Sequence, residues 1–430
     1  MNRRMTRAVI SRLGATECAV EQDLQQFGSE DWERTLNWLD DSGLALYFLR
    51  HLQDTHTTAI IPPQVLSRLE VSFIHNQARW ERLVEEFAQI NKDFQLAGIP
   101  FAVIKGLSLV PDYCPDTRLR TPSDLDFLVE RKDLHIANRV LEKLGYRTKE
   151  KSDIELKFWK PGPKMPTKSD DPYSVGTEAL VELHFGFWQH THRILLREPL
   201  FLLDDVIWHS WQGLEFPVLD QTNAFLLQII HVFQHITTCW VKLCWLLEIG
   251  FFMSRHSRDT DFWLKVDAQM RQSPSLAEFA AIVVGLVKNV FGSPIPSIAT
   301  KWMDLLCSGS KLWLDKYAED WVVDDHSYRR SAFFRRAKLS LFLHQQYLPD
   351  QKTRKKVILH QLFPCKRPDN RLLFPDNEPA RGLVSLSTRG KFAAERIMFH
   401  AGSTLRYLCE VPRWRYRARQ RSVASLRSDS

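Results

Sequence analysis

Apolar side chains follow a helical period over most of the first hundred residues. Residues 1–60 have apolar positions three or four apart, and Pro62-Pro63 then interrupts the pattern. The same spacing returns beyond these prolines and predicts a long helix over residues 64–96. Ala97-Gly98 ends this helix, because glycine readily adopts the left-handed conformation found just after helices.

Short apolar or alternating segments follow Gly98 and are typical of strands that are buried on at least one face. Helices are expected between them over residues 107–113 and 133–144. Asp133 would cap the second helix and Gly145 would end it. The predicted strands are residues 99–104, 125–129, 154–159 and 178–187.

From residue 195 onward the apolar spacing is helical again. The chain then becomes basic and rich in proline, so a loose tail is expected from Arg413 to Ser430. The predicted helices are residues 222–236, 240–253, 262–270, 275–290 and 329–343.

These elements predict an α+β protein, with a mixed sheet and flanking helices, N-terminal helices and a C-terminal helical bundle. The length of 430 residues allows two or three domains with their own cores. The predicted regions are an N-terminal helical region over residues 1–96, an α/β core over 97–190, a helical domain over 191–350 and a basic irregular region over 351–430.

Two carboxylates mark the second predicted strand. Asp124 and Asp126 are two residues apart, so both side chains point away from the face that carries Leu125 and Phe127. Neighbouring carboxylates repel each other unless a cation or a proton separates them. Oxygen ligands without a thiolate favour Mg²⁺ or Mn²⁺ over Zn²⁺. An Asp-x-Asp pair also occurs on solvated strand edges, and this alternative stays open.

Glu182 is a third carboxylate, on the polar face of the strand predicted over residues 178–187. If this strand lies beside the one with Asp124 and Asp126, three carboxylates converge. That arrangement suits two metal ions about 3.5–4 Å apart. His184 shares the face of Glu182 and would either orient the metal ligands or serve as a structural histidine.

These motifs resemble the nucleotidyltransferase superfamily that includes DNA polymerase β and the aminoglycoside nucleotidyltransferases. They are closer to a bacterial group of uncharacterised nucleotidyltransferase family proteins. The resemblance spans roughly residues 62–253. The matching segments are residues 98–106, Arg120, residues 124–129, residues 144–146, residues 181–184 and the helical segment around His231, His235 and Glu248.

The resemblance implies a polymerase-β-like sheet and the transfer of a nucleoside monophosphate from an NTP to a hydroxyl group. Pyrophosphate would leave, and Mg²⁺ or Mn²⁺ would be the cofactor. The implied metal ligands and catalytic residues are Asp124, Asp126 and Glu182. The implied nucleotide-binding residues are Lys105, Gly106, Ser108, Arg120 and Ser123.

The glycine loop differs from the superfamily pattern, because Leu107 separates Gly106 from Ser108. This difference motivates a second hypothesis, a nucleotide-binding or partner-binding module with little catalysis. Lys105 could equally be a surface lysine at the end of a strand. The acceptor stays open among a small molecule, a glycan precursor, a protein and an RNA, and so does the base of the donor.

Composition excludes several classes of protein. Hydrophobic residues make up 44% of the chain and charged residues 25%, which is ordinary for a globular protein. Seven scattered cysteines without a CxxC pair predict reduced thiols and a cytoplasmic location. The basic start is followed by too few apolar residues for a signal peptide, and no segment has the ~18 uninterrupted apolar residues of a spanning helix.

The chain also contains two groups of histidines and an arginine-rich C-terminal segment. His184, His190 and His192 lack a recognised zinc spacing, and His231 and His235 lack the glutamate of a zinc-protease helix. For His231 and His235, the alternatives are a structural role at the edge of the core or contact with substrate. The net charge of +7 and the arginines near the C-terminus allow weak contact with RNA or an anionic membrane, against a simply solvated end.

Overall fold

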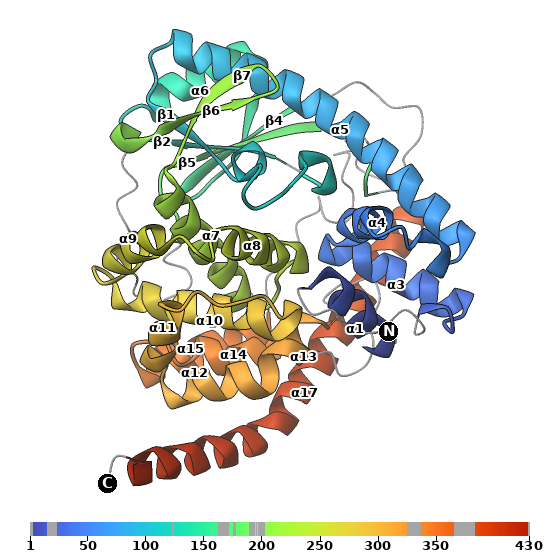
Figure 1. The fold of residues 1–430 in the computed structure, drawn as a ribbon, viewed down its shortest axis with the longest axis vertical. Helices are drawn as coiled ribbons and strands as arrows, with labels where there is room; N and C mark the ends of the chain where they lie inside the picture. The colour runs from blue at the N-terminus through green and yellow to red at the C-terminus, as the bar shows by residue number, and fades with distance from the viewer. Residues whose placement is uncertain are drawn as a thin grey trace. The chain divides into compact units, whose positions relative to one another are not determined.

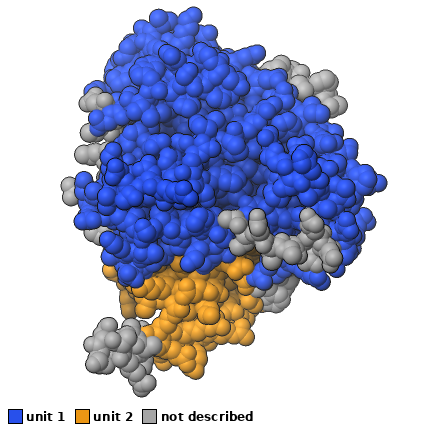
Figure 2. Space-filling model, viewed as in Figure 1, with its two compact units in different colours: residues 1–191, 196–234, 242–305 blue, residues 192–195, 235–241, 306–430 orange. Residues whose placement is uncertain are grey.

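The structure is a computed structural model in which the chain divides into two compact units (Figure 2). Unit 1 comprises residues 1–191, 196–234 and 242–305, and unit 2 comprises residues 192–195, 235–241 and 306–430. The described residues are 3–14, 24–122, 124–161, 172–174, 178–188, 194, 196, 203–324, 337–364 and 383–428.

Unit 1 begins with helices, as the apolar spacing predicts. The long helix α5 runs from Pro63 to Leu96, which confirms the predicted helix over residues 64–96. Proline suits the first turn of a helix, where its missing N–H has no partner to lose. Gly98 follows α5 with a φ of 64°, in the left-handed region. The earlier elements are α1 (Arg3–Leu13), α3 (Ser29–Ser42), α4 (Ala45–Asp54) and the short η1 (Thr58–Ile60).

A seven-stranded mixed sheet is the centre of unit 1, with the order β3-β4-β5-β2-β1-β7-β6 (Figure 1). The β2–β5 and β1–β7 pairs are parallel, and the other pairs are antiparallel. The α+β class predicted from the sequence is therefore confirmed. The strands are β1 (Phe101–Ile104), β2 (Leu125–Val129), β3 (Arg147–Lys151), β4 (Glu155–Pro161), β5 (Glu178–His184), β6 (Ile207–Trp211) and β7 (Leu214–Val218).

One face of the sheet is apolar and is covered by α5 and by α6 (Leu134–Lys143). Phe127 of β2 is fully buried there among aromatic rings. Its ring centroid lies 5.3 Å from that of Phe94 and 6.0 Å from those of Phe87 and Phe101. Such aromatic pairs add to the free energy gained from burial alone. Because side chains alternate along a strand, the residues between these apolar positions point to the other face.

Two expectations for this region are wrong. Residues 207–218 form the β6–β7 hairpin, although helical structure was expected from residue 195 onward. Gln212 and Gly213 have φ values of 48° and 79°, as the turn of a two-residue hairpin requires, and this turn signal was missed. The helix expected over residues 107–113 is a single 3₁₀ turn, η2 (Gly106–Leu109), because Pro111 disfavours a helical conformation at the preceding residue.

The first four helices after the sheet match their predicted positions within a few residues, and the fifth, over residues 299–305, was not predicted. Asp220 caps α7, since its carboxylate accepts hydrogen bonds from the backbone N–H groups of Thr222 and Asn223. The helices are α7 (Gln221–Thr237), α8 (Leu243–Arg255), α9 (Thr260–Met270), α10 (Pro274–Phe291) and α11 (Ala299–Leu305).

Unit 2 is helical in its described part. The helix predicted over residues 329–343 lies partly outside the described residues, and its described part forms η7 and α14. The elements are α12 (Ser308–Trp313), the π-helical η6 (Leu314–Ala318), α13 (Glu319–Val322), η7 (Ala337–Ser340), α14 (Leu341–His344), α15 (Gln351–Leu362) and α17 (Leu383–Ser428).

The irregular structure predicted for residues 351–430 is wrong where the chain is described, because residues 351–362 and 383–428 are helical. Residues 383–428 form α17, a single helix of 46 residues that contains Pro412 (Figure 1). Tertiary packing overrides the proline here, because Trp414 stacks on Phe342 with the ring centroids 4.6 Å apart. Among the described residues, the structure has no helix with the length and apolar content needed to cross a membrane.

Lys338 of η7 is a buried amine in unit 2, with only 3% of its surface exposed. Its Nζ donates to Thr404 Oγ1 at 2.7 Å, to Leu362 O at 2.9 Å and to His400 O at 3.3 Å. All three acceptors are uncharged. Burial therefore dominates and lowers the pKa of Lys338 to about 8.

The stability of unit 2 should consequently rise with pH above about 8. The unfolded lysine keeps its proton up to about pH 10.4, whereas the folded one loses it near 8, so the unfolded state binds more protons in this window. Replacing Lys338 by Met should remove a rise on the order of 1–2 kcal/mol between pH 7 and pH 10. Urea unfolding at pH 7 and pH 10 measures this change in the free energy of unfolding. Lys355→Met on α15, which replaces an exposed lysine, is the control. Equal pH dependence in all three proteins would contradict the prediction.

Candidate active site

The register between β2 and β5 brings the predicted carboxylates to one face of the sheet. The strands are parallel, and Asp126 pairs directly with Glu182. On the far side of β5, the antiparallel β4 places Lys157 beside Glu182 and Glu155 beside His184. Residues paired across neighbouring strands share a face. Five polar side chains therefore meet opposite the apolar core.

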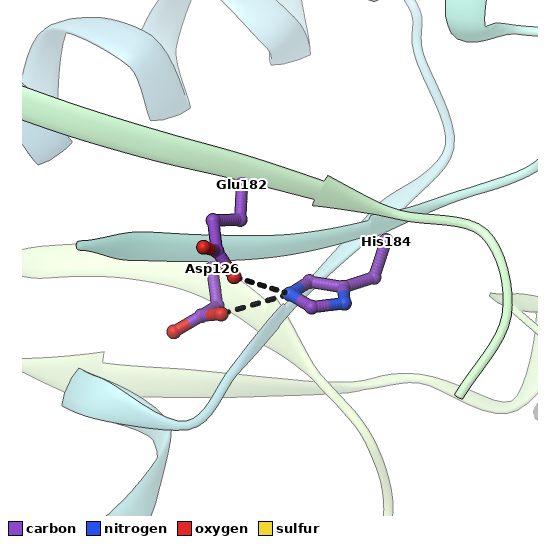
Figure 3. A group of neighbouring side chains, drawn as sticks. All are labelled: Asp126, Glu182 and His184. Carbon is purple, nitrogen blue, oxygen red and sulfur yellow. Dashed lines mark hydrogen bonds and ion pairs between the residues drawn. The ribbon is translucent and has the colours of Figure 1, made fainter. Parts of the chain in front are cut away.

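His184 lies between the carboxylates (Figure 3). Its Nε2 is 2.8 Å from Asp126 Oδ1 and 3.3 Å from Glu182 Oε2, and its Nδ1 is 3.6 Å from Glu155 Oε2. Asp126, Glu182 and His184 are all buried, and each offers one ligand atom within 4.8 Å of the others. This group could hold a metal ion.

Two lysines neutralise the same carboxylates. Lys105 Nζ donates to Asp126 Oδ1 at 2.8 Å. Lys157 Nζ donates to Glu182 Oε1 and lies 3.1 Å from Glu155 Oε1. Since these ion pairs are partly or fully buried, water screens them weakly. The chain therefore supplies its own counter-charges for the acidic cluster.

These contacts separate the pKa values of the acids. Burial opposes the ionisation of Asp126, but Lys105 and His184 outweigh it and hold the pKa of Asp126 well below its usual range. The pKa of Glu182 is also lowered, because the hydrogen bond from His184 and the nearby lysines outweigh burial. Conversely, burial together with the charges of Asp126 and Glu182 raises the pKa of Asp124 to about 7.

Asp124 directly precedes β2 and is half-buried. No hydrogen bond to its carboxylate is found among the described residues, and the charges of Lys105 and Lys157 lower its pKa. A divalent cation would relieve the repulsion between Asp124 and its acidic neighbours. Asp126 and Glu182 thus offer oxygen donors that suit Mg²⁺ or Mn²⁺, and His184 adds a nitrogen donor, whereas Asp124 lies outside this group of neighbouring ligand atoms.

The turn after β1 aims Lys105 at this cluster. Lys105 and Gly106 have φ values of 56° and 45°, so two successive residues adopt the left-handed region. For a lysine this conformation costs roughly 1–3 kcal/mol and persists only where other contacts maintain it. Ser108 supplies such contacts, because both its N–H and its hydroxyl donate to Lys105 O, at 2.9 and 2.8 Å.

Leu107, the residue that interrupts the superfamily's glycine pattern, is buried in the core with 2% exposure. Lys105, Gly106 and Ser108 stay partly exposed. The interposed leucine therefore occupies the apolar core and leaves the polar positions of the turn facing the other way.

Arg120 is a buried link between this turn and α8. Its Nε donates to Glu248 Oε1 at 2.7 Å, and Tyr47 Oη donates to the same oxygen at 2.6 Å. Arg120 Nη1 also donates to Gly106 O at 3.4 Å. Trp80 Nε1 donates to the backbone carbonyl of Arg120 at 2.9 Å. In the structure Arg120 therefore braces the turn, and a contact with phosphate stays a prediction.

Sequence reasoning did not select Glu155 and Lys157 as site residues. A signal was present, because the predicted strand over residues 154–159 alternates and its polar positions share one face. Only the pairing of β4 with β5 shows that this face meets Glu182. Tyr47 had no detectable signal, since its α4 is far away in the sequence.

The remaining candidates have other surroundings or are not described. Ser123, His190 and His192 lie outside the described residues. The other predicted histidines contact tryptophans: His231 with Trp245 in unit 1, and His235 with Trp240 in unit 2.

A mixed sheet with carboxylates on adjoining strands, beside a lysine–glycine turn, defines the nucleotidyltransferase class of folds. The family model described as uncharacterised nucleotidyltransferase matches residues 28–292, and the chain belongs to this family. The match includes α3 to α10, so it covers the sheet, the turn and the helix that carries Glu248. No curated protein matches the chain.

The buried pair of Arg120 and Glu248 yields a stability prediction. Replacing Glu248 by Ala leaves the guanidinium buried without its counter-charge and should destabilise unit 1 by about 3–5 kcal/mol. Glu248→Gln keeps an acceptor for the Tyr47 hydroxyl, so its free energy of unfolding should lie between those of the parent and Glu248→Ala. Urea unfolding measures both.

The matched control is Glu30→Ala, which breaks the exposed ion pair with Arg34 on α3. Exposed pairs contribute little because water competes for both charges. A loss of stability as large in Glu30→Ala as in Glu248→Ala would refute the structural role of the Arg120 link.

Proposed function

We propose that the protein is a metal-dependent nucleotidyltransferase that transfers a nucleoside monophosphate from an NTP to a hydroxyl-bearing acceptor. The observation that supports this most strongly is the direct pairing of Asp126 with Glu182 across β2 and β5, beside Asp124 and the turn at Lys105. Family membership supports the same reaction class.

In this proposal Asp124, Asp126 and Glu182 hold Mg²⁺ or Mn²⁺. When bound, the cation supplies positive charge for the phosphate oxygens of the nucleotide. Lys105 and the backbone N–H groups of the turn at Gly106 contact the phosphates, since glycine allows close approach of the backbone. Ser108 and the brace from Arg120 keep the turn in place.

The reaction is an in-line displacement at the α-phosphorus. The acceptor oxygen forms a bond to this phosphorus, the bond to the bridging oxygen of the β-phosphate breaks, and pyrophosphate leaves with the electron pair. Glu182 helps to take the proton of the acceptor hydroxyl. His184 contacts Asp126, Glu182 and Glu155. Lys157 contacts Glu182 and Glu155, so both side chains position these carboxylates.

The alternative function is a nucleotide-binding or partner-binding module on the same fold with little catalysis. The interposed Leu107 motivated it. The burial of Leu107 in the core argues against it, because the polar groups of the turn do not have to move aside for the extra side chain.

Transfer of label from α-³²P-labelled NTPs tests the proposal. Each of the four NTPs is supplied with Mg²⁺ or Mn²⁺ and a cell lysate as the source of acceptors. Asp126→Asn should lower labelling by about 1,000-fold, because it removes a proposed ligand of the cation. The charge stabilisation that the cation supplies amounts to several kcal/mol. Asp54→Asn, on the exposed carboxylate that pairs with Arg50 on α4, is the matched control and should label like the parent.

Nucleotide binding measured on the same proteins separates the two functions. Label that depends on Asp126 supports nucleotidyl transfer. Unchanged labelling in the Asp124→Ala/Asp126→Ala double variant would overturn the assigned roles. Tight NTP binding by the parent without transfer or pyrophosphate release would favour the binding module.

A further inference from the structure

Helix α17 in unit 2 has two apolar faces, and only one of them is covered. The covered face carries Phe399, Tyr407 and Trp414, all nearly buried. Phe342 of α14 stacks on Tyr407 at 4.7 Å and on Trp414 at 4.6 Å between ring centroids. This packing attaches the helix to the rest of unit 2 through one side.

The opposite side of α17 exposes large apolar residues. A surface helix normally presents polar side chains there. Instead, steps of three or four residues connect exposed apolar positions from residue 397 to residue 412, which is the spacing of a single helical face. We call this set the outer stripe; its large members are Ile397 (67% exposed), Met398 (44%), Leu405 (44%) and Leu408 (50%), with Tyr416 (64%) at its end.

Positive charge continues this line. Arg415 and Arg419 lie three and seven residues beyond Pro412, so they extend the same face, and both are exposed. Residues 411–428 contain six arginines and no acidic residue. The outer stripe is therefore apolar over four turns and then strongly basic.

We propose that the outer stripe docks on an anionic lipid surface. In this arrangement α17 lies in the plane of the interface, with Leu405 and Leu408 at the boundary of the acyl chains and Arg415 and Arg419 on the lipid phosphates. Apolar area and electrostatic attraction add in such binding. The inference is independent of the nucleotidyl transfer proposed above.

Charge complementarity selects this occupant over two others. A nucleic acid would use the arginines but leave Leu405 and Leu408 in water, where exposed apolar area is costly. A second copy packed in parallel would bring one arginine cluster against the other, and like charges repel. An anionic bilayer satisfies both parts of the stripe at once.

Flotation of the full chain with vesicles tests the proposal. One set contains phosphatidylcholine alone, and the other contains about one third phosphatidylglycerol. The parent protein should float with the anionic vesicles only. Arg415→Gln/Arg419→Gln should lower the partition coefficient about 30-fold, and Leu405→Ser/Leu408→Ser by roughly tenfold.

Two double variants in unit 1 serve as matched controls. Arg147→Gln/Lys151→Gln removes two charges from the exposed edge strand β3, and Leu264→Ser/Leu305→Ser removes two exposed leucines. Both should bind vesicles like the parent. Thermal unfolding checks that every variant keeps its fold, which is expected because all the replaced side chains are exposed.

Three results would overturn the proposal. The first is no binding to anionic vesicles by the parent. The second is binding that falls equally in the stripe variants and the controls, which would indicate general charge. The third is tight binding of an RNA or DNA oligonucleotide that depends on Arg415 and Arg419 but not on the leucines. Dimerisation that depends on Leu405 and Leu408, without vesicle binding, would assign the stripe to a second copy.

Discussion

The parallel register between β2 and β5 is the constraint on which the candidate site depends. It sets Asp126 opposite Glu182 and leaves the alternate residues, Phe127 and Leu183, in the aromatic core. A slip of one residue would move Glu182 into that core and Leu183 onto the polar face. The buried core therefore opposes any register except the one that joins the carboxylates. The same register therefore packs the apolar face of the sheet and brings the carboxylates together on the other face.

An acidic cluster in a protein interior needs counter-charges, and this chain provides them from three directions. Lys105 comes from the turn after β1, Lys157 from β4, and His184 from the end of β5. The carboxylates are thus held in place before any cation arrives, which lowers the reorganisation that binding requires. The left-handed backbone at Lys105 is the conformational cost of this arrangement.

The errors of prediction have different physical causes. The turn of the β6–β7 hairpin and the effect of Pro111 after η2 are local signals that were missed, whereas the helix α17 depends on α14, a partner distant in sequence. Local patterns contain no information about such partners. For α17, Pro412 and the dense arginines indicated irregular structure, but Trp414 packs against Phe342 and stabilises the helix. The same packing leaves the opposite apolar face of α17 uncovered.

The sequence by itself determined the long helix α5, the strand that follows Asp124 and carries Asp126, and the carboxylate at Glu182, because period and residue type are local properties. Its motifs also indicated the nucleotidyltransferase family. Only the tertiary structure decided that β4 adds Lys157, that Leu107 lies in the core, and that Arg120 turns inward to Glu248. These outcomes depend on which elements become neighbours, and burial and charge pairing between distant segments determine that choice.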